Sequence, residues 1–301
     1  MSRPVYIAIP AWNEPYVTLA LRYTVPAVLV SLAAHRGAGD VHFIIHTDQR
    51  SAFRAALPNQ RISFLPVVRG PGSSHESNWR AFERAHRDAI EHTPQGALLI
   101  LLNADIVCSI ETVAVVDAAL RGGKKIGMAV GIRTLIDPAA PPPVGARAAE
   151  LAAWIWQHKH PIIAELVWGA GSSNVPTMLF FDHPDGAVSM HCFHLAPMFM
   201  VKDARPLSYS STIDDNLIEN YTATEVAFFR DLEFSLAEMS PAHKTHGASH
   251  PLTVPRVLEF VKQWNMRPVH RQHFRHRFAV LGIATQNHEA ADAIIAGVSS
   301  A

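Results

Sequence analysis

In the stretch ALLILLNADIV, residues 97–107, an unbroken apolar run stops at Asn103-Ala104-Asp105, and hydrophobicity then resumes. An apolar run of this length between polar residues is typical of a buried strand. Ligands of open α/β sheets bind outside the carboxyl ends of the strands, so Asp105 is well placed to hold a metal or a polar substrate group. The alternative is a simple turn, because Asn and Asp side chains readily bond to their own backbone. The stretch alone leaves both interpretations open.

Strand-like and helix-like segments alternate on both sides of this stretch, a pattern that predicts a mainly parallel sheet. Strands are expected at residues 5–9, 41–45, 62–68, 98–102 and 126–132, and helices at 16–35, 50–57, 78–91, 110–121 and 146–158. Residues 178–181 and 188–194 flank the turn DHPDG and predict an antiparallel hairpin. Further helices are expected at 214–221 and 225–237, followed by a basic, histidine-rich helix and an alanine-rich one. The sequence therefore predicts an α/β fold, with helices flanking the sheet, a small antiparallel β element and a C-terminal helical tail.

Length and composition narrow the class of protein. The 301 residues suit one large domain or two smaller ones, and the proline-rich connection at residues 138–143 is a candidate boundary. Lys plus Arg equals Asp plus Glu at 26 each, so no overall charge attracts nucleic acid. Only two cysteines occur, Cys108 and Cys192, which fits a reducing cytoplasm.

The sequence shows no signal-peptide pattern, which argues against secretion. It also has no long uncharged apolar run, which argues against a transmembrane span. We therefore expect a cytoplasmic protein, with contact at the inner face of the membrane left open. The basic run at residues 267–277 is a candidate surface for a diphosphate, an anionic acceptor or a lipid, or else a solvated face.

Polar side chains follow several of the predicted strands. Asn13 and Glu14 follow the first, Asp48 follows the second and Asp105 follows the fourth. The carboxyl ends of parallel strands share one edge, so these side chains are expected along one crevice. No Gly-x-Gly-x-x-Gly motif follows the first strand and no P-loop motif occurs, which argues against dinucleotide oxidoreductases and P-loop enzymes.

These residues resemble the GT-A glycosyltransferases, in particular the inverting family 2-like group. Such enzymes open with a strand and Pro-x-Tyr-Asn-Glu, which Pro10-Ala11-Trp12-Asn13-Glu14 matches with tryptophan in place of tyrosine. Their second strand ends in an aspartate that contacts the base, a role the resemblance assigns to Asp48. Their fourth strand ends in Asp-x-Asp, and Asn103-Ala104-Asp105 matches its final member only. A later acidic pair that opens a helix is similar to Asp214-Asp215.

The resemblance implies a Rossmann-like catalytic domain over residues 1–250, with a nucleotide-binding half at 1–107 and an acceptor half at 108–250. Residues 251–301 are then a helical extension packed on it. The implied reaction moves a sugar, with inversion, from a nucleotide-diphosphate donor to a hydroxyl of a glycan, a lipid-linked acceptor or a small acceptor. The donor is expected to contact Pro10, Trp12, Asn13, Glu14, Asp48, Ser77, Asn78, Asn103 and Ala104. Ser77 and Asn78 are included because a helix N-terminus with hydroxyls suits phosphate or ribose, although they could merely cap the helix.

A divalent cation suits this chemistry, because breaking the bond between sugar and diphosphate builds negative charge on the leaving group. Mg²⁺ and Mn²⁺ prefer oxygen ligands and retain waters, so one or two carboxylates suffice. Asp105 is expected to bind the metal, while Asn103 can accept a hydrogen bond from ribose. A later histidine often completes the metal shell in these families. His191 and His194 are the candidates, of which we expect His194, and a hydrogen-bonded core histidine is the alternative for either.

The acidic pair and an aromatic loop are the candidates on the acceptor side. Asp215 is expected to be the general base that takes the proton of the acceptor hydroxyl, with Asp214 orienting it. Adjacent carboxylates raise one another's pKa, which would help one of them accept that proton. A plain helix N-cap is the alternative for the pair. Trp168 and Gly169 lie in a loop where the aromatic ring could stack on a sugar, or the loop could be a flexible connector.

Two other functions fit the same architecture. Nucleotidyltransferases usually begin with a Gly-rich loop that carries Arg and Lys, which residues 10–14 lack. A non-catalytic nucleotide-sugar-binding protein is the other, since Asn103 stands where a carboxylate is usual. A retaining glycosyltransferase also stays open.

Overall fold

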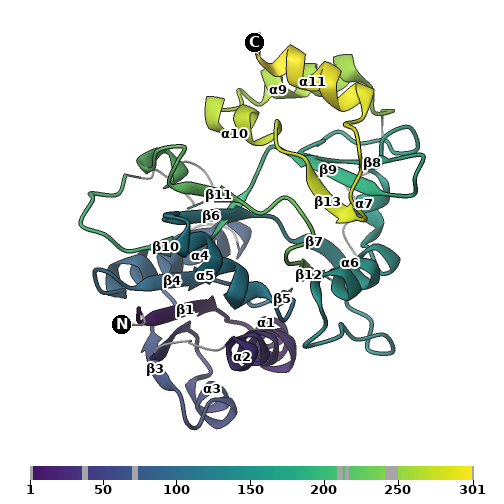
Figure 1. The fold of residues 1–301 in the computed structure, drawn as a ribbon. Helices are drawn as coiled ribbons and strands as arrows, with labels where there is room; N and C mark the ends of the chain where they lie inside the picture. Colours follow the sequence, from purple (N-terminus) through teal and green to yellow (C-terminus); the bar gives the residue numbers. More distant parts are fainter. Residues whose placement is uncertain are drawn as a thin grey trace.

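The computed structural model describes residues 3–35, 40–69, 74–208, 213, 217–240 and 250–299. Its centre is a seven-stranded sheet with the strand order β11-β6-β10-β4-β1-β2-β3 (Figure 1). Neighbouring strands are parallel except where β10 pairs with β4 and β6. The strands are β1 (Val5–Pro10), β2 (Val41–His46), β3 (Arg61–Leu65), β4 (Leu98–Leu101), β6 (Ile126–Ala129), β10 (Ala196–Val201) and β11 (Val226–Phe228). The mainly parallel sheet predicted from the sequence is therefore confirmed.

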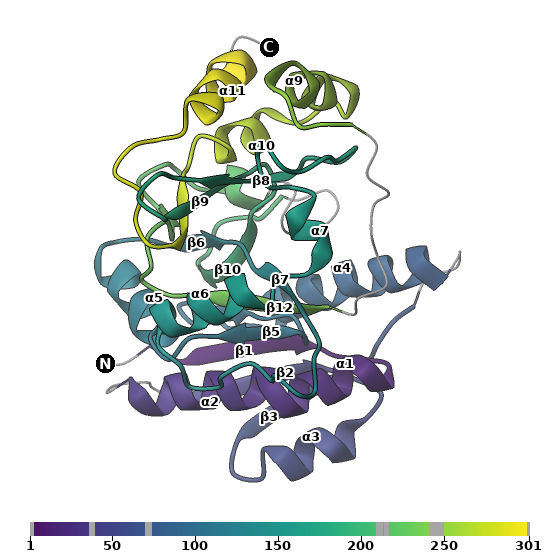
Figure 2. The same cartoon turned by 90° about the vertical axis from the view of Figure 1, so that its right-hand side faces the viewer.

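Helices flank this sheet because its central strands are apolar on both faces. All four side chains of β4, for example, are buried. The helices around the central sheet are α1 (Glu14–Leu19), α2 (Val25–Ala34), α3 (Arg50–Ala56), α4 (Ser74–His92) and α5 (Thr112–Arg121), whereas α6 (Ala148–Gln157) packs on two smaller sheets. A π-helical turn, η1 (Ala20–Thr24), makes α1 and α2 continuous. Figure 2 shows α2 and α3 on one side of β1.

The continuous helix at residues 14–34 is the one described helix whose length and composition would allow it to cross a membrane, and 56% of its most apolar window is buried. Val17, Ala20 and Val28 belong to the main hydrophobic core. In this fold the helix therefore serves as a core helix.

A second, three-stranded sheet differs from the sequence prediction. It has the order β5-β12-β7 and consists of β5 (Ile106–Cys108), β7 (Ile132–Leu135) and β12 (Leu236–Ser240). The predicted strand 126–132 is two strands, β6 and β7. The predicted helix 225–237 is wrong, because this segment supplies β11 to the central sheet, then a turn, and then the first residues of β12. Pairing with β6, β5 and β7 outweighs the helical spacing of its apolar residues.

Two other segments also differ from the prediction. Residues 196–201 form β10, a strand that was not predicted from the sequence, and β10 tolerates proline because the strand pairing shifts register between Pro197 and Phe199. The predicted helix 214–221 is reduced, in its described part, to the 3-10 helix η2 (Leu217–Asn220).

The hairpin of β8 (Met178–Asp182) and β9 (Val188–Cys192) is antiparallel, as predicted. The C-terminal segment adds β13 (Phe278–Leu281) beside β9, a strand that the predicted helical tail did not include. The helices of this segment are α9 (Val254–Gln263), α10 (Pro268–His273) and α11 (Glu289–Ser299), and the short α7 (Pro161–Ala164) precedes β8. Leu179, Phe181 and Phe193 form a cluster with apolar side chains of α9 and α11. The C-terminal segment thus covers the hairpin (Figure 2).

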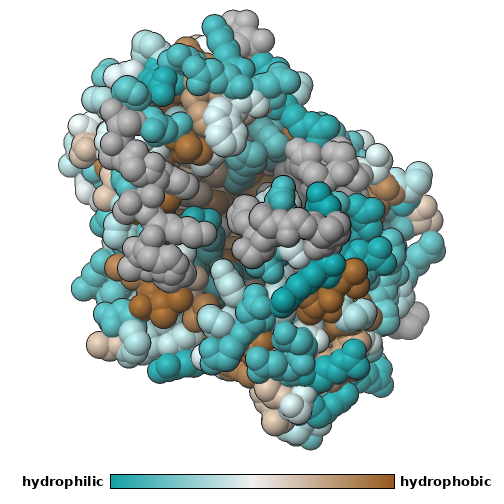
Figure 3. All heavy atoms as spheres, turned by 180° about the vertical axis from the view of Figure 1, so that it is seen from behind, coloured by the Kyte–Doolittle hydropathy of each residue, from teal (hydrophilic) through white to brown (hydrophobic). Residues whose placement is uncertain are grey.

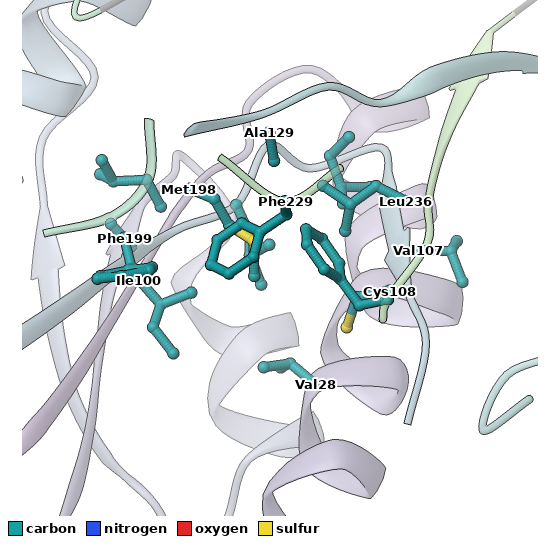
Figure 4. Packing of buried hydrophobic residues seen from close by; sticks show 14 of the residues in the cluster. Val28, Ile100, Val107, Cys108, Ala129, Met198, Phe199, Phe229 and Leu236 are labelled. Atoms are coloured by element: carbon teal, nitrogen blue, oxygen red, sulfur yellow. The ribbon is translucent and has the colours of Figure 1, made fainter. Parts of the chain in front are cut away.

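One large core joins the early and late parts of the chain. Figure 4 shows Ile100 beside Phe199, with Val28 and Leu236 in other parts of the same packing. All four belong to the same buried cluster, although they come from α2, β4, β10 and β12. The segments 1–107 and 108–250 therefore share one hydrophobic core.

Candidate functional site

A cleft of about 430 Å³ lies where the carboxyl end of β4 meets α4, β12 and the segment that leads into β10. Most of its lining is apolar. Its polar and charged lining residues are His86, Asn103, Arg133, Thr177, His194 and Glu238. A mostly apolar concavity with a few converging polar groups is the usual form of a small-molecule site. Of the residues predicted from the sequence, the cleft therefore brings together Asn103 and His194.

Trp12 and Asn78, both predicted to contact the donor, are in contact with each other. The indole Nε1 of Trp12 donates a hydrogen bond to Asn78 Oδ1 at 3.3 Å. Trp12 is buried and meets Phe82 edge to face, with 6.2 Å between ring centroids. Because Phe82 lines the cleft, the packing of Trp12 against Phe82 supports the wall that α4 contributes to the cleft.

Other predicted donor residues have local structural partners. Asn13 adopts a positive φ of 65° and its Oδ1 accepts a hydrogen bond from Arg69 Nη2 at 2.9 Å. Glu14 begins α1 and accepts a hydrogen bond from Thr18 at 3.2 Å. Asp48 is exposed after β2. Among the described residues, the lining of the cleft includes none of Asn13, Glu14 and Asp48.

Pro10, Ser77 and Ala104 also lie near this edge without lining the cleft. Pro10 ends β1 beside His46 of β2. Ser77 is half-buried in the first turn of α4. The carbonyl of Ala104 accepts a hydrogen bond from Thr24 Oγ1 at 2.8 Å. These contacts hold the chain at the carboxyl ends of the strands.

Asp105 lies between β4 and β5, half-buried, and its backbone carbonyl accepts a hydrogen bond from Met239 N at 2.8 Å. Burial raises the pKa of the Asp105 carboxyl to about 7, and the negative charge of Glu238 adds to that rise. The positive charge of Arg133 lowers the pKa of Asp105, and Arg133 Nε donates a hydrogen bond to Glu238 Oε1 at 2.8 Å. Burial and the same two carboxylates also raise the pKa of Tyr16.

The donor set at Asp105 suits a hard cation. Asp105 and Glu238 supply two carboxylates, and Mg²⁺ or Mn²⁺ is commonly held by one or two carboxylates together with substrate phosphates. No group of three or more His, Cys, Asp or Glu side chains in the described part of the chain could hold a metal by itself. A cation at this place would therefore depend on ligand oxygens as well. Sequence reasoning missed Glu238 because it directly follows a segment that was predicted to be helical.

Two buried histidines at this edge were also missed. His46 ends β2 and His86 lies on α4, with exposed fractions of 1% and 4%. Within the described residues, none of their ring nitrogens has a hydrogen-bond partner of normal geometry. Burial lowers the pKa of His46 to about 4 and that of His86 to about 3, so both rings are neutral at pH 7.

Only His86 of this pair lines the cleft. Its ring packs edge to face on Phe82 at 4.3 Å, and the nearby Asn103 amide slightly favours its charged form. A neutral imidazole offers one donor and one acceptor. The sequence did contain a signal for His86, because it lies seven residues after Trp79 and therefore on the same, apolar face of the predicted helix.

The two candidate metal histidines have different surroundings. His194 is half-buried beyond the end of β9, lines the cleft and contacts the His270 ring at 4.4 Å. His191 is fully buried, with Nδ1 2.7 Å from the Phe274 carbonyl oxygen and Nε2 2.9 Å from Asn287 Oδ1. His191 thus binds the C-terminal segment.

The residues predicted on the acceptor side are only partly described. Trp168 stacks on Phe181 at 5.6 Å and packs against the cluster under the C-terminal helices. Gly169 follows it with a φ of 82°. Asp214 and Asp215 lie outside the described residues, but the preceding Ile213 is buried and lines the cleft.

Neither a protein-family model nor a curated protein matches this chain. Solved structures similar to it include nucleotide-sugar transferases. Residues 1–349 of S. aureus TarS, solved with UDP-GlcNAc, align with a TM-score of 0.41 and 10% identity, over 98% of this chain and 71% of that one. Mouse xyloside xylosyltransferase 1 aligns with a TM-score of 0.30 and 13% identity, over 42% of this chain and 52% of that one.

A third similar structure is the 4-diphosphocytidyl-2C-methyl-D-erythritol synthase of Anaerococcus prevotii. It aligns with a TM-score of 0.34 and 9% identity, over 88% of this chain and 97% of that one. Likenesses with scores this low carry no argument about the reaction of this chain.

Proposed function

We propose that the protein is a glycosyltransferase that moves a sugar from a nucleotide-diphosphate donor to a hydroxyl acceptor, with inversion. The observation that carries this proposal is the cleft at the carboxyl end of β4, where Asn103 and His86 face the same space as Glu238. The neutral amide and imidazole suit hydroxyl groups of ribose. Phe82 and Trp79 offer aromatic faces to a base or a sugar.

The charges of the cleft support a role for a divalent cation. In the described lining the charged side chains are Arg133 and Glu238, which are paired at 2.8 Å and leave no net positive charge. A diphosphate therefore requires another source of positive charge there. Asp105 and Glu238 would hold Mg²⁺ or Mn²⁺ together with oxygens of the diphosphate, without His194, because no three such side chains of the described residues come together, and the cation would stabilise the leaving diphosphate as a Lewis acid.

The acceptor half of the reaction is assigned to the residues that the sequence predicts on the acceptor side. Asp215 would take the proton of the acceptor hydroxyl, whose oxygen attacks the anomeric carbon while the bond from that carbon to the diphosphate oxygen breaks. Asp214 would orient Asp215, and Trp168 and Gly169 would contact the acceptor. The acceptor is a glycan, a lipid-linked molecule or a small hydroxyl compound.

The proposed location is the cytoplasm. The face of the molecule in Figure 3 is mostly hydrophilic, and its apolar side chains form small separate patches. The described residues of that face therefore offer no broad apolar surface for a bilayer.

A thermal-shift screen tests the proposal. Nucleoside diphosphates and nucleotide sugars are added with and without Mn²⁺, because a ligand at a hundred times its Kd stabilises the folded state by about 2.7 kcal/mol. We expect one nucleotide class to raise the Tm, and more strongly with Mn²⁺. Mass spectrometry then follows transfer, and NMR of the product anomer tests inversion. If no nucleotide raises the Tm, the proposal is wrong; undiminished transfer in excess chelator would remove the cation from it.

Nucleotidyl transfer is the second candidate, because Arg69 brings a guanidinium to the loop at residues 10–14 that the loop itself lacks. Release of inorganic diphosphate from a nucleoside triphosphate would distinguish that reaction. Binding of a nucleotide sugar without either reaction would instead favour a non-catalytic binding protein, as Asn103 in the place of a carboxylate suggests.

A further inference from the structure

A second hollow, of about 200 Å³, lies between α10 and α11 and shares no lining residue with the cleft. Arg271, Gln272 and Arg275 line it from α10 and the turn that follows. Val298 and Ser299 line it from the end of α11. In Figure 1 these two helices lie at the opposite end of the molecule from β3 and α3.

The two arginines of this hollow have no carboxylate partner among the described residues. Arg271 is half-buried, and its Nε is fully buried without a hydrogen-bond acceptor in this part of the chain. Arg275 Nη2 donates to Ser299 Oγ at 2.9 Å, and that hydroxyl donates to the Ile295 carbonyl at 2.6 Å. The lining therefore carries two positive charges and no negative one.

Another partly buried arginine of the protein does have carboxylate partners. Arg205, which is similarly shielded from solvent, binds the carboxylates of Asp203 and Glu225. A buried guanidinium nitrogen without an acceptor is costly, and two like charges that line the same hollow, one from α10 and one from the turn after it, repel each other. The arrangement of Arg271 and Arg275 does not help folding, so it needs another explanation.

We propose that the hollow between α10 and α11 binds a phosphate group, either free in solution or on a lipid headgroup. The planar guanidinium fork matches two phosphate oxygens at once, and a phosphate has enough oxygens to accept hydrogen bonds from both arginines. Gln272 supplies a neutral amide donor at the same hollow. The site is independent of the proposed transfer reaction.

Titration with inorganic phosphate at constant ionic strength tests the site, using isothermal calorimetry on the whole chain. Wild type is expected to bind phosphate saturably, and Arg271→Gln to weaken binding by about tenfold or more, the usual cost of losing a charged hydrogen bond. Arg271→Lys should recover part of the affinity, because it keeps the charge without the fork. Arg61→Gln is the control, since this exposed arginine near Asp40 makes the same charge change far from the hollow.

A flotation experiment separates the two sources of phosphate. Vesicles of phosphatidylcholine are compared with vesicles that also contain phosphatidic acid. If wild type binds the vesicles that contain phosphatidic acid and Arg271→Gln does not, the ligand is a lipid headgroup. If wild type binds phosphate saturably but does not float with these vesicles, the ligand is free phosphate. Equal phosphate binding and flotation by wild type and Arg271→Gln would overturn the proposal, as would no binding in either assay. Matching circular dichroism spectra and Tm values show that the variant is folded.

Discussion

Replacing His86 by leucine should remove part of the acid sensitivity of the fold. Burial lowers the pKa of His86 from 6.5 to about 3, so between these values the unfolded chain binds a proton that the folded chain refuses. The stability that depends on the neutral ring is present above pH 6.5 and is lost as the pH falls toward 3. At pH 5 the loss is about 2 kcal/mol, against only a few tenths at pH 7.

The assay is urea unfolding followed by circular dichroism at pH 7 and at pH 5. On going from pH 7 to pH 5, we expect the free energy of unfolding of wild type to fall by about 2 kcal/mol more than that of the variant, because only wild type carries the titrating ring. Comparing the two proteins cancels the other groups, including Asp105, whose raised pKa acts in the opposite direction. Ile90→Val, a buried and non-titrating change on the same helix, should cost about 1 kcal/mol at both pH values.

A stability difference between wild type and His86→Leu that is the same at pH 7 and pH 5 would refute this reasoning. It would mean that water or a rearranged α4 solvates the ring in the folded state. The buried, unpartnered imidazole would then no longer be available as a recognition group in the cleft.

Three further predictions concern other parts of the molecule. Gly127→Ala should lower the stability by about 3 kcal/mol, measured by urea unfolding, because its Cβ would overlap the Phe199 ring and lie 2.7 Å from Phe229. Arg205→Met should lower the Tm at pH 7 because it leaves Lys125 as the only ion-pair partner of Asp203 and Glu225 among the described residues. This deficit should shrink in a pH series below about pH 4, as Asp203, whose pKa of about 2 depends mainly on Arg205, is protonated in the variant. Asp105→Asn should leave the Tm of the ligand-free protein unchanged or raised, since burial opposes the charge of the Asp105 carboxyl. The same variant should lose any Mn²⁺-dependent rise in Tm caused by nucleotides, and an unchanged Mn²⁺ effect would contradict the assignment of Asp105 as a cation ligand.

The parallel part of the fold could be predicted because its signals are local. The strands near residues 5–9 and 98–102 are unbroken apolar runs, the strand near 41–45 is apolar except for His42, and the helices between them follow a helical period. β10 and β12 could not be predicted in this way. β10 has a proline as its second residue, next to a register shift, and β12 depends on partners more than a hundred residues away. Long-range pairing decides such strands, and it leaves little trace in the local sequence.

The candidate site divides in the same manner. Asn103 and Asp105 were predictable because they follow a recognisable strand. Glu238 was not, since its relation to Asp105 exists only after β12 pairs with β5. His86 was hidden for another reason, because a histidine on the apolar face of a helix is usually a core residue with a partner. Only the absence of a hydrogen-bond partner of normal geometry for its ring nitrogens in the described structure distinguishes it.

This distribution of charge changes the meaning of Asn103. Seen along the sequence, Asn103-Ala104-Asp105 lacks one of two expected carboxylates, which argues against binding of a cation. In space, Glu238 stands close enough to Asp105 to raise its pKa, so the second carboxylate is supplied by a different strand. A third carboxylate at position 103 would add a further negative charge near Asp105, whose pKa is already raised. On the proposed function, the neutral amide at Asn103 therefore keeps two carboxylates available to a cation, while it leaves a hydrogen-bonding group for the ribose beside His86.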